Sequence, residues 1–233
     1  MSSIQLLSIV LPVYNQAQHI GSIVQEYDKV LEGLRYRYEM ILVVNGSNDD
    51  TLSVCRSLES RFSSIRVVCS EKGGWGLAIK LGLAASQGDL LCYTNSARTT
   101  PQDLLLILLY AVANRNVVIK ANRKIRESWF RRLGSLLYNL ECRMLFDLSF
   151  WDINGTPKVF PRSFNKLMLL NQNDDLIDME FNIVCRNEEY PILEVPILSH
   201  QRHGGKSTTN IFSAYKLYLG AYKYWRKKVL NRG

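Results

Sequence analysis

The sequence predicts an α/β fold, with a mainly parallel β-sheet that carries helices on both faces. Short apolar runs rich in β-branched residues alternate with longer amphipathic stretches along the first half of the chain. Residues that favour turns end the apolar runs, as Asn45-Gly46-Ser47 does. Strands that are apolar throughout are buried on both faces, which is typical of a parallel sheet between helices.

The first strand is expected at 8–14, where Ser-Ile-Val-Leu-Pro-Val-Tyr is stopped by Asn-Gln. The helix that follows, at 19–34, places its apolar residues on one stripe: Ile20, Ile23, Val24, Tyr27, Val30 and Leu31. The same alternation predicts strands at 39–44, 64–69, 89–93 and 116–121. Helices are expected between them, at 51–62, at 77–86 after a glycine-rich turn, and from Pro101 onward.

The second half of the chain has a different pattern. A long helix at 127–148 precedes a hairpin-like stretch at 150–162, and a helix through 178–180 leads to a strand at 192–198. A loop at 199–210 connects this strand to a last helix at 211–230. The sequence contains no internal repeat, low-complexity segment or linker. We therefore expect one domain at 1–207 and a basic amphipathic C-terminal helix at 208–233.

The composition is that of a globular protein, with 233 residues of which 47% are hydrophobic and 21% charged. The five cysteines are odd in number and lack metal-ligand spacing, so we expect reduced thiols in the cytoplasm. The N-terminus shows no secretory signal, and the longest apolar run is too short to cross a bilayer. These features predict a cytoplasmic protein.

The formal net charge of +8 favours an anionic partner, which is a nucleic acid, an anionic membrane or a phosphorylated small molecule. Much of this charge lies in two clusters, at 123–132 and 216–232. No nucleic-acid-binding module is visible, and the basic residues flank an expected small-molecule crevice. Nucleic acid is therefore not an expected partner.

Three polar segments follow the ends of predicted strands, at Tyr14–Gln16, Asn45–Asp49 and Thr94–Arg98. Ligands of such sheets bind beyond the carboxyl ends of the strands, so we expect all three segments to line one crevice. The third is unusual for this place because Tyr-Thr-Asn-Ser-Ala-Arg-Thr-Thr-Pro, at 93–101, contains no acid.

Several segments, in order along the chain, resemble the family 2 glycosyltransferases of the GT-A fold, most closely their polyprenyl- or dolichyl-phosphate sugar synthase branch. They are 8–20, 45–51, Gly74–Ala78 with Gly82 and Gly88-Asp89, Asp152–Gly155 with Lys158–Arg162, and Glu-Val-Pro-Ile-Leu-Ser-His-Gln-Arg-His-Gly-Gly-Lys-Ser at 194–207. The resemblance covers nearly the whole chain. It implies an inverting glycosyltransferase with a GT-A sheet and a nucleotide-sugar donor.

The chain departs from this family where acids are expected. The metal-binding Asp-x-Asp motif falls on Asn95-Ser96-Ala97, the two acids of the nucleotide-binding turn become Val44 and Asn45, and the Glu of the first loop becomes Gln16. Amides keep a hydrogen-bonding shape without the charge, whereas Mg²⁺ and Mn²⁺ prefer carboxylates. We expect no bound metal; Mg²⁺ or Mn²⁺, completed by Asp49 or Asp152, is the alternative.

Fixed positive charge is then expected to replace the cation beside the donor phosphates. Arg98 directly follows the lost acids, and its guanidinium suits a diphosphate, although it could instead cap a loop in solvent. The resemblance places further phosphate-binding positions on Arg123, Arg131, Ser135, Lys206 and Ser207. The donor-binding residues are expected to be Pro12, Tyr14, Asn15, Gln16, Asn45, Asp49, Gly74, Asn95 and Ala97.

Catalytic roles are expected for Asp152, Arg202 and Arg98. A phosphate acceptor is already anionic and needs cations to hold it, whereas a hydroxyl acceptor needs a general base. The acid-poor, arginine-rich crevice favours a polyprenyl phosphate, with a cell-surface glycan as the other acceptor. For a hydroxyl acceptor the candidate bases are Asp152, Asp178 and Glu180. Asp152 could instead organise the turn at 154–155, and Glu180 could face solvent.

The last helix carries aromatic and apolar residues on one broad side and basic residues elsewhere, as helices at membrane surfaces do. We expect a peripheral protein at the inner face of the membrane. Packing of this helix on the rest of the chain or in a homo-oligomer is the alternative. The alternative function is a degenerate transferase that binds a nucleotide-sugar or a partner without turnover.

Overall fold

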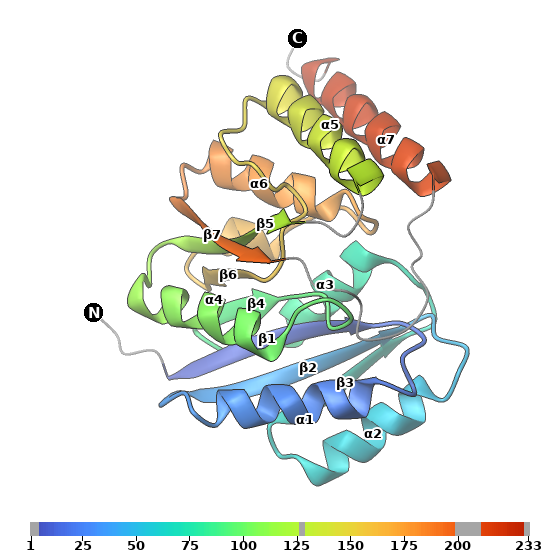
Figure 1. The fold of residues 1–233 in the computed structure, drawn as a ribbon, viewed down its shortest axis with the longest axis vertical. Helices are drawn as coiled ribbons and strands as arrows, with labels where there is room; N and C mark the ends of the chain where they lie inside the picture. The colour runs from blue at the N-terminus through green and yellow to red at the C-terminus, as the bar shows by residue number, and fades with distance from the viewer. Residues whose placement is uncertain (1–4, 126–128, 199–210, 231–233) are drawn as a thin grey trace.

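The computed structural model describes residues 5–125, 129–198 and 211–230, without the side chains at 125–131 and 211–214. In this part of the chain a seven-stranded sheet lies between layers of helices (Figure 1). The strands are β1 Leu6–Val13, β2 Arg37–Asn45, β3 Ile65–Ser70, β4 Leu90–Tyr93, β5 Val118–Ile125, β6 Lys158–Pro161 and β7 Ile192–Leu198. The helices are α1 Ile20–Leu31, α2 Thr51–Arg61, α3 Trp75–Ala85, α4 Pro101–Ala113, α5 Trp129–Phe146, a 3₁₀ helix η1 Asn165–Met168, α6 Ile177–Asn187 and α7 Ile211–Leu230. The predicted α/β fold is confirmed.

The strand order in the sheet is β3-β2-β1-β4-β6-β5-β7. β1 pairs in parallel with β2 and β4, β2 with β3, and β5 with β7. Only β6 runs antiparallel to its neighbours in the described sheet, β4 and β5. The order of the strands reverses between β1 and β4, which is where such sheets open a crevice beyond the strands' carboxyl ends.

Helices cover both faces of the sheet. On one face α1, α2 and α4 share a core with Ile9 and Leu11 of β1. On the other face α3, η1 and α6 share a core with Val10 and Ile41. Because successive strand residues point to opposite faces, burial of both faces explains the continuous apolar runs in the sequence.

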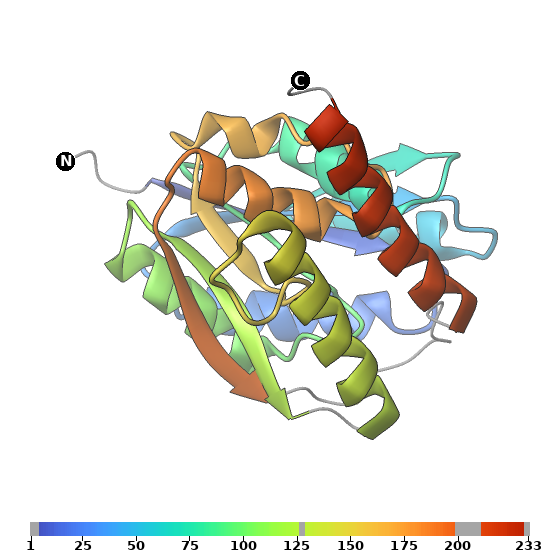
Figure 2. The same cartoon turned by 90° about the horizontal axis from the view of Figure 1, so that it is seen from above.

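α5 and α7 form a further layer outside α6, and they lie side by side in both views (Figures 1 and 2). Tyr138 and Cys142 of α5, Met179 of α6 and Ala221 of α7 belong to one apolar cluster. One side of α7 therefore packs on the rest of the chain. The expected boundary at residue 207 falls outside the described residues, so the division into two parts stays a prediction.

No helix in the described part of the chain combines the length and the apolar character that a membrane span requires.

The expected hairpin at 150–162 is wrong. In this stretch only Lys158–Pro161 forms a strand, and its partners are β4 and β5. The preceding residues form a turn in which Gly155 N donates to Asp152 O at 3.0 Å. This turn is held by α5, because Ile153 N donates to Asn139 Oδ1 at 3.1 Å. The segment thus satisfies its backbone against a helix, not against a second strand.

α3 approaches the sheet very closely at Gly82. A Cβ atom at this position would collide with Cγ1 of Val10 and lie 3.0 Å from Cγ2 of Val43. We expect Gly82→Ala to lower the free energy of unfolding by about 1–3 kcal/mol, because stiff β-branched neighbours have to move. Urea unfolding followed by circular dichroism measures this change.

The matched control is Gly134→Ala in α5, where an added Cβ would meet no described atom within 4 Å beyond its helical neighbours. Alanine should raise stability there by about 0.5–1 kcal/mol, because glycine is unfavourable inside a helix. Equal effects at the two positions would contradict the close approach at Gly82.

Candidate functional site

The loops after β1 and β2 are joined by hydrogen bonds at the carboxyl edge of the sheet. Asn15 N donates to Ser47 Oγ at 3.1 Å, and Asn48 N donates to Asn15 Oδ1 at 3.0 Å. Gln16 N donates to Thr51 Oγ1 at 2.8 Å. Asn15 adopts a positive φ of 48°, a region that asparagine tolerates better than most residues. The first two predicted segments therefore lie side by side.

Asp49, one of the expected donor-binding residues, organises this junction. Its carboxylate accepts from the backbone and the hydroxyl of Thr51, and from Ala17 N at 3.3 Å. Desolvation acts to raise the pKa of Asp49, but the hydrogen bonds from Thr51 and Ala17 lower it. The contacts of this carboxylate thus fix the start of α2. A hollow of about 370 Å³ opens beside it, lined by Asn15, Ala17, Gln18, His19, Asp49 and Asp50.

The loop after β4 joins the same edge. Ser96 Oγ lies 3.2 Å from Gln16 Oε1 and 3.3 Å from Pro12 O, and its one O–H group is shared between these two acceptors. Within the loop, Ala97 N donates to Asn95 Oδ1 at 3.0 Å and Thr99 N to Asn95 O at 3.0 Å. The three segments therefore meet at one edge of the sheet, and their lining of one crevice stays a prediction.

Two larger side chains lie at this edge. Tyr14 is 45% exposed. Arg98 is half-buried, and its backbone N–H donates to Asn95 O at 3.0 Å. Their roles stay predictions.

Asn45, at the end of β2, presents a buried acceptor. Its Nδ2 donates to Gly74 O at 3.0 Å, while its Oδ1 has no hydrogen-bond partner in the described part of the chain. The residue is only 5% exposed. An unpaired buried acceptor is costly, so this oxygen calls for an N–H or O–H group from a ligand or a water.

Gly74 itself has to be glycine. Its φ is 145°, and an added Cβ would lie 2.5 Å from the carbonyl oxygen of Asn173. Only glycine adopts this conformation readily. The start of α3 is thereby held against the segment before α6, with Gly74 O placed to orient Asn45.

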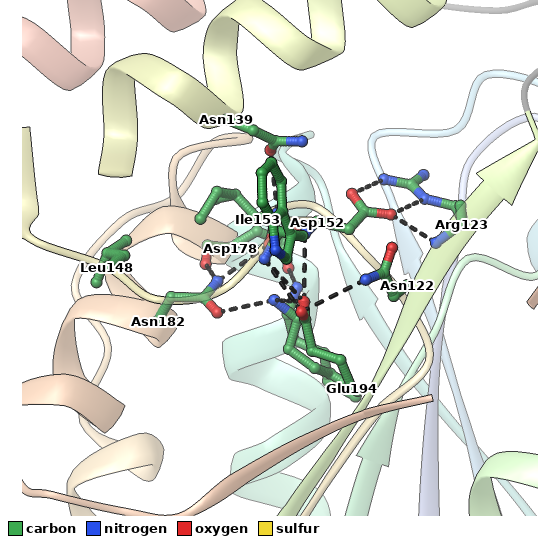
Figure 3. Close-up of polar contacts among 12 residues, drawn as sticks. Asn122, Arg123, Asn139, Leu148, Asp152, Ile153, Asp178, Asn182 and Glu194 are labelled. Carbon is green, nitrogen blue, oxygen red and sulfur yellow. Dashed lines mark hydrogen bonds and ion pairs between the residues drawn. The ribbon is translucent and has the colours of Figure 1, made fainter. Parts of the chain in front are cut away.

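A cluster of buried charges lies beyond β4, on the α6 side of the sheet. Arg123 forks onto Asp152: Nε and Nη2 each donate at 2.8 Å to a different carboxylate oxygen, and Arg123 N donates at 3.0 Å (Figure 3). Asp152 is almost fully buried, whereas the Arg123 side chain keeps 19% of its surface exposed. The sequence assigned these residues to different roles, and the structure brings them together as one ion pair.

Two lysines in the same cluster are completely buried. Lys158 pairs with Asp178, which also accepts from Tyr93 Oη and Trp75 Nε1, each at 2.9 Å. Lys120 lies 3.1 Å from Glu194 Oε1. Desolvation lowers the pKa of both lysines, that of Lys158 to about 8, while the neighbouring carboxylates act in the opposite direction.

The three cations of this cluster face three carboxylates, so the buried charge is balanced. Asp178, a candidate base, is occupied by its lysine, and Glu180 accepts from the backbone of Asn171 and Gln172. The roles of Lys120 and Lys158 were not predicted from the sequence. For Lys120 the available signal was its place after Val117-Val118-Ile119, since lysine is rarely buried unless paired. Lys158 directly follows Pro157 and carries no such signal.

Several predicted phosphate-binding residues are not placed. Arg202, Lys206 and Ser207 lie outside the described residues, as does the side chain of Arg131. Ser135 is half-buried on α5. Their roles therefore remain predictions from the resemblance.

The sequence model of glycosyl transferase family 2 matches residues 8–168. An undecaprenyl-phosphate 4-deoxy-4-formamido-L-arabinose transferase of Edwardsiella ictaluri (strain 93-146) is 25% identical over 219 residues, or 92% of this chain and 66% of that protein. A transferase of the same name from Pseudomonas syringae pv. syringae (strain B728a) is 27% identical over 71% of this chain and 50% of its own length. The chain thus spans half to about two thirds of these curated relatives.

Solved structures with the same fold include glucosyl-3-phosphoglycerate synthase from Mycobacterium tuberculosis in complex with Mn²⁺, UDP and phosphoglyceric acid. Its TM-score is 0.72 at 17% identity, over 95% of this chain and 78% of that one. The same enzyme with UDP alone gives a TM-score of 0.71 at 16% identity, over 95% and 80% of the two chains. These neighbours confirm the GT-A type of sheet.

We expect Lys158→Met to lower the free energy of unfolding by about 3–5 kcal/mol at pH 7, because Asp178 loses its buried cation. The difference in the free energy of unfolding between wild type and this variant should widen from pH 8 to pH 10. The folded lysine loses its proton near pH 8 and the unfolded one near 10.5, so wild-type stability rises with pH through this window. Urea unfolding across this pH range measures both effects.

Lys166→Met is the control, since Lys166 is exposed on η1. It should change stability by less than about 0.5 kcal/mol at every pH. A gap for Lys158→Met that narrows as the pH rises would contradict a lowered pKa.

Proposed function

The chain belongs to glycosyl transferase family 2, and on this basis we propose that it transfers a sugar, with inversion, from a nucleotide-sugar to a polyprenyl phosphate. The observation that carries the donor half is the unpaired Oδ1 of Asn45 at the end of β2. The acceptor half is supported by the names of the relatives, which are undecaprenyl-phosphate sugar transferases.

The donor's nucleobase is proposed to lie beside Asn45. Because Nδ2 is committed to Gly74 O, the free oxygen can only accept a hydrogen bond. Uracil and guanine carry a ring N–H on their pairing edge, whereas the ring nitrogen of cytosine at that place is an acceptor. We place this ring nitrogen against the Asn45 oxygen. In that orientation Asn45 favours a uridine or guanosine nucleotide over a cytidine nucleotide, whose exocyclic NH₂ group could donate only from a shifted base.

The acceptor phosphate is proposed to lie near Arg123. Asp152 holds this guanidinium through both carboxylate oxygens, so it fixes the direction of the cation and is itself occupied. We therefore assign Asp152 to the positioning of Arg123, with Arg131, Ser135, Arg202, Lys206 and Ser207 as further phosphate-binding residues. This arrangement suits an anionic acceptor better than a hydroxyl that needs a base.

In the proposed reaction an oxygen of the acceptor phosphate attacks the anomeric carbon as the bond to the nucleoside diphosphate breaks. The acceptor oxygen is anionic, so no proton has to be removed. The protein's contribution is to align two anionic groups and to stabilise the departing diphosphate. Arg98, at the edge between the two sites, is proposed to contribute to that stabilisation.

The membrane is the proposed location of the acceptor, and α5 and α7 are the proposed contact surface. α5 exposes an apolar stripe opposite its buried side, with exposed fractions of 44–76% for Leu133, Leu136, Leu137, Leu140 and Met144. α7 contains no acid, and its Lys216, Lys223, Arg226 and Lys227 are exposed. Apolar and basic surface together suit an anionic bilayer, at whose inner face we place the protein. Two copies joined through this surface would bring like charges together.

The reaction is tested by incubating the protein with undecaprenyl phosphate and uridine, guanosine and cytidine diphosphate sugars, including glucose and 4-deoxy-4-formamido-L-arabinose derivatives. We expect labelled sugar in the lipid fraction with uridine or guanosine donors. Cytidine donors should react at least about 10-fold more slowly, because their ring acceptor faces the Asn45 oxygen.

Transfer to a water-soluble glycan but not to the lipid would contradict the proposed acceptor. Tight binding of a nucleotide-sugar without transfer to any acceptor would favour the alternative of a degenerate transferase. Faster transfer from cytidine donors would contradict the role of Asn45.

The membrane contact is tested by sedimentation with vesicles that contain anionic phospholipid. We expect Leu136→Gln/Leu140→Gln to weaken vesicle binding by about 10-fold or more, since each exposed leucine side chain contributes over 1 kcal/mol when buried in lipid. Leu106→Gln/Leu109→Gln on α4, which changes two other exposed leucines, is the control. Equal losses for both pairs would exclude α5 as the contact surface.

A further inference from the structure

The residues at the position of the family's metal motif do not fit a divalent cation. Asn95 Oδ1 already accepts from Ala97 N at 3.0 Å, and the Ala97 side chain is a methyl group that is 98% buried, with 2% exposure. Ser96 is buried and its hydroxyl donates inward. In the described part of the chain no group of three or more His, Cys, Asp or Glu side chains could hold a metal ion.

The hydrogen bonds of Asn95 fix which way its amide faces. A backbone N–H can only donate, so the atom that it meets is the amide oxygen, and the NH₂ group has to point away from the turn. This Nδ2 has no hydrogen-bond partner in the described residues, and the side chain is only half-buried. The loop after β4 thus presents an N–H donor where a metal-binding relative presents a carboxylate oxygen.

Gln16 contributes a second amide. Its Oε1 accepts from the Ser96 hydroxyl at 3.2 Å, and among the described residues its Nε2 has no hydrogen-bond partner. Asn95 follows β4 and Gln16 follows β1, so the two amides flank the point where the strand order reverses. Asn45, two strands away from Asn95, has the opposite polarity, because its nitrogen is used and its oxygen is free.

We propose that the Asn95 and Gln16 NH₂ groups bind the donor's diphosphate directly, in place of a metal ion. This inference rests on the proposed function. Phosphate oxygens accept hydrogen bonds, so N–H donors at fixed positions bind them well. The same N–H donors repel a cation. The crevice then has a matching group for each part of a nucleoside diphosphate. The Asn45 oxygen accepts a hydrogen bond from the base, and the Gln16 and Asn95 NH₂ groups donate to the phosphates.

The test is calorimetric titration of the protein with UDP and GDP, each with EDTA and with Mn²⁺. Wild type should bind one of them with a Kd that differs by less than about 3-fold between the two conditions. Asn95→Asp keeps the oxygen that Ala97 N needs but replaces the donor by a charged acceptor. We expect it to weaken binding in EDTA by about 10-fold or more, since a charge-assisted hydrogen bond is lost. Part of this loss should return with Mn²⁺.

Gln16→Glu is the second variant, with the same expected direction. Asn187→Asp and Gln25→Glu are the matched controls, because they make the same chemical change at exposed positions without altering either amide. Both controls should bind as wild type does in EDTA. Thermal unfolding of every variant shows whether a weaker Kd reflects lost folding.

The outcomes separate this inference from the proposed function. Wild-type binding that requires Mn²⁺, with sugar transfer intact, would overturn the metal-free site and leave the transferase standing. An unchanged nucleotide affinity of Asn95→Asp in EDTA would likewise overturn the phosphate-binding role of the amide and leave the transferase standing. No binding of either nucleotide under both conditions, and no transfer, would overturn both.

Discussion

The buried pair of Lys158 and Asp178 is the interaction on which the second half of the structure depends. Asp178 lies on α6, Lys158 on β6, and the same carboxylate accepts from Tyr93 of β4 and Trp75 of α3. Two charges removed from water are tolerable only when each is paired and the remaining lone pairs are used. The pair therefore fixes the sheet, α3 and α6 relative to one another beneath the crevice.

The two proposed ligand regions, one on each side of this ion pair, differ in electrostatic character. The loops after β1, β2 and β4 offer mainly amides and backbone groups, with Asp49 tied to the start of α2. The region beyond β4 offers charge, with Arg123 held by Asp152. The two phosphorylated molecules would then be recognised differently: the donor mainly through neutral hydrogen bonds, with Arg98 at the edge, and the acceptor mainly through cations.

Much of the fold could be predicted from the sequence, and less of the site. A continuous apolar run such as residues 9–13 is buried on both faces only between two layers of helices. The sheet and its covering helices could therefore be predicted from the spacing of apolar residues. The hairpin at 150–162 failed because the backbone of Ile153 finds its acceptor on α5, a contact 14 residues away that no local pattern records. The direction of the Asn95 amide was equally hidden, because it depends on one turn hydrogen bond.

The turn at Asn95 has a consequence for how this site can change over generations. Asparagine and aspartate codons differ by one base, and the side chains by one group, yet here that exchange replaces an outward NH₂ by an outward oxygen while the turn itself is kept. The backbone would keep its conformation, because the Ala97 N–H finds an oxygen acceptor in either case. A lineage could thus gain the first of the carboxylates that an ion needs, in exchange for a phosphate-binding amide, without first passing through a misfolded ancestor.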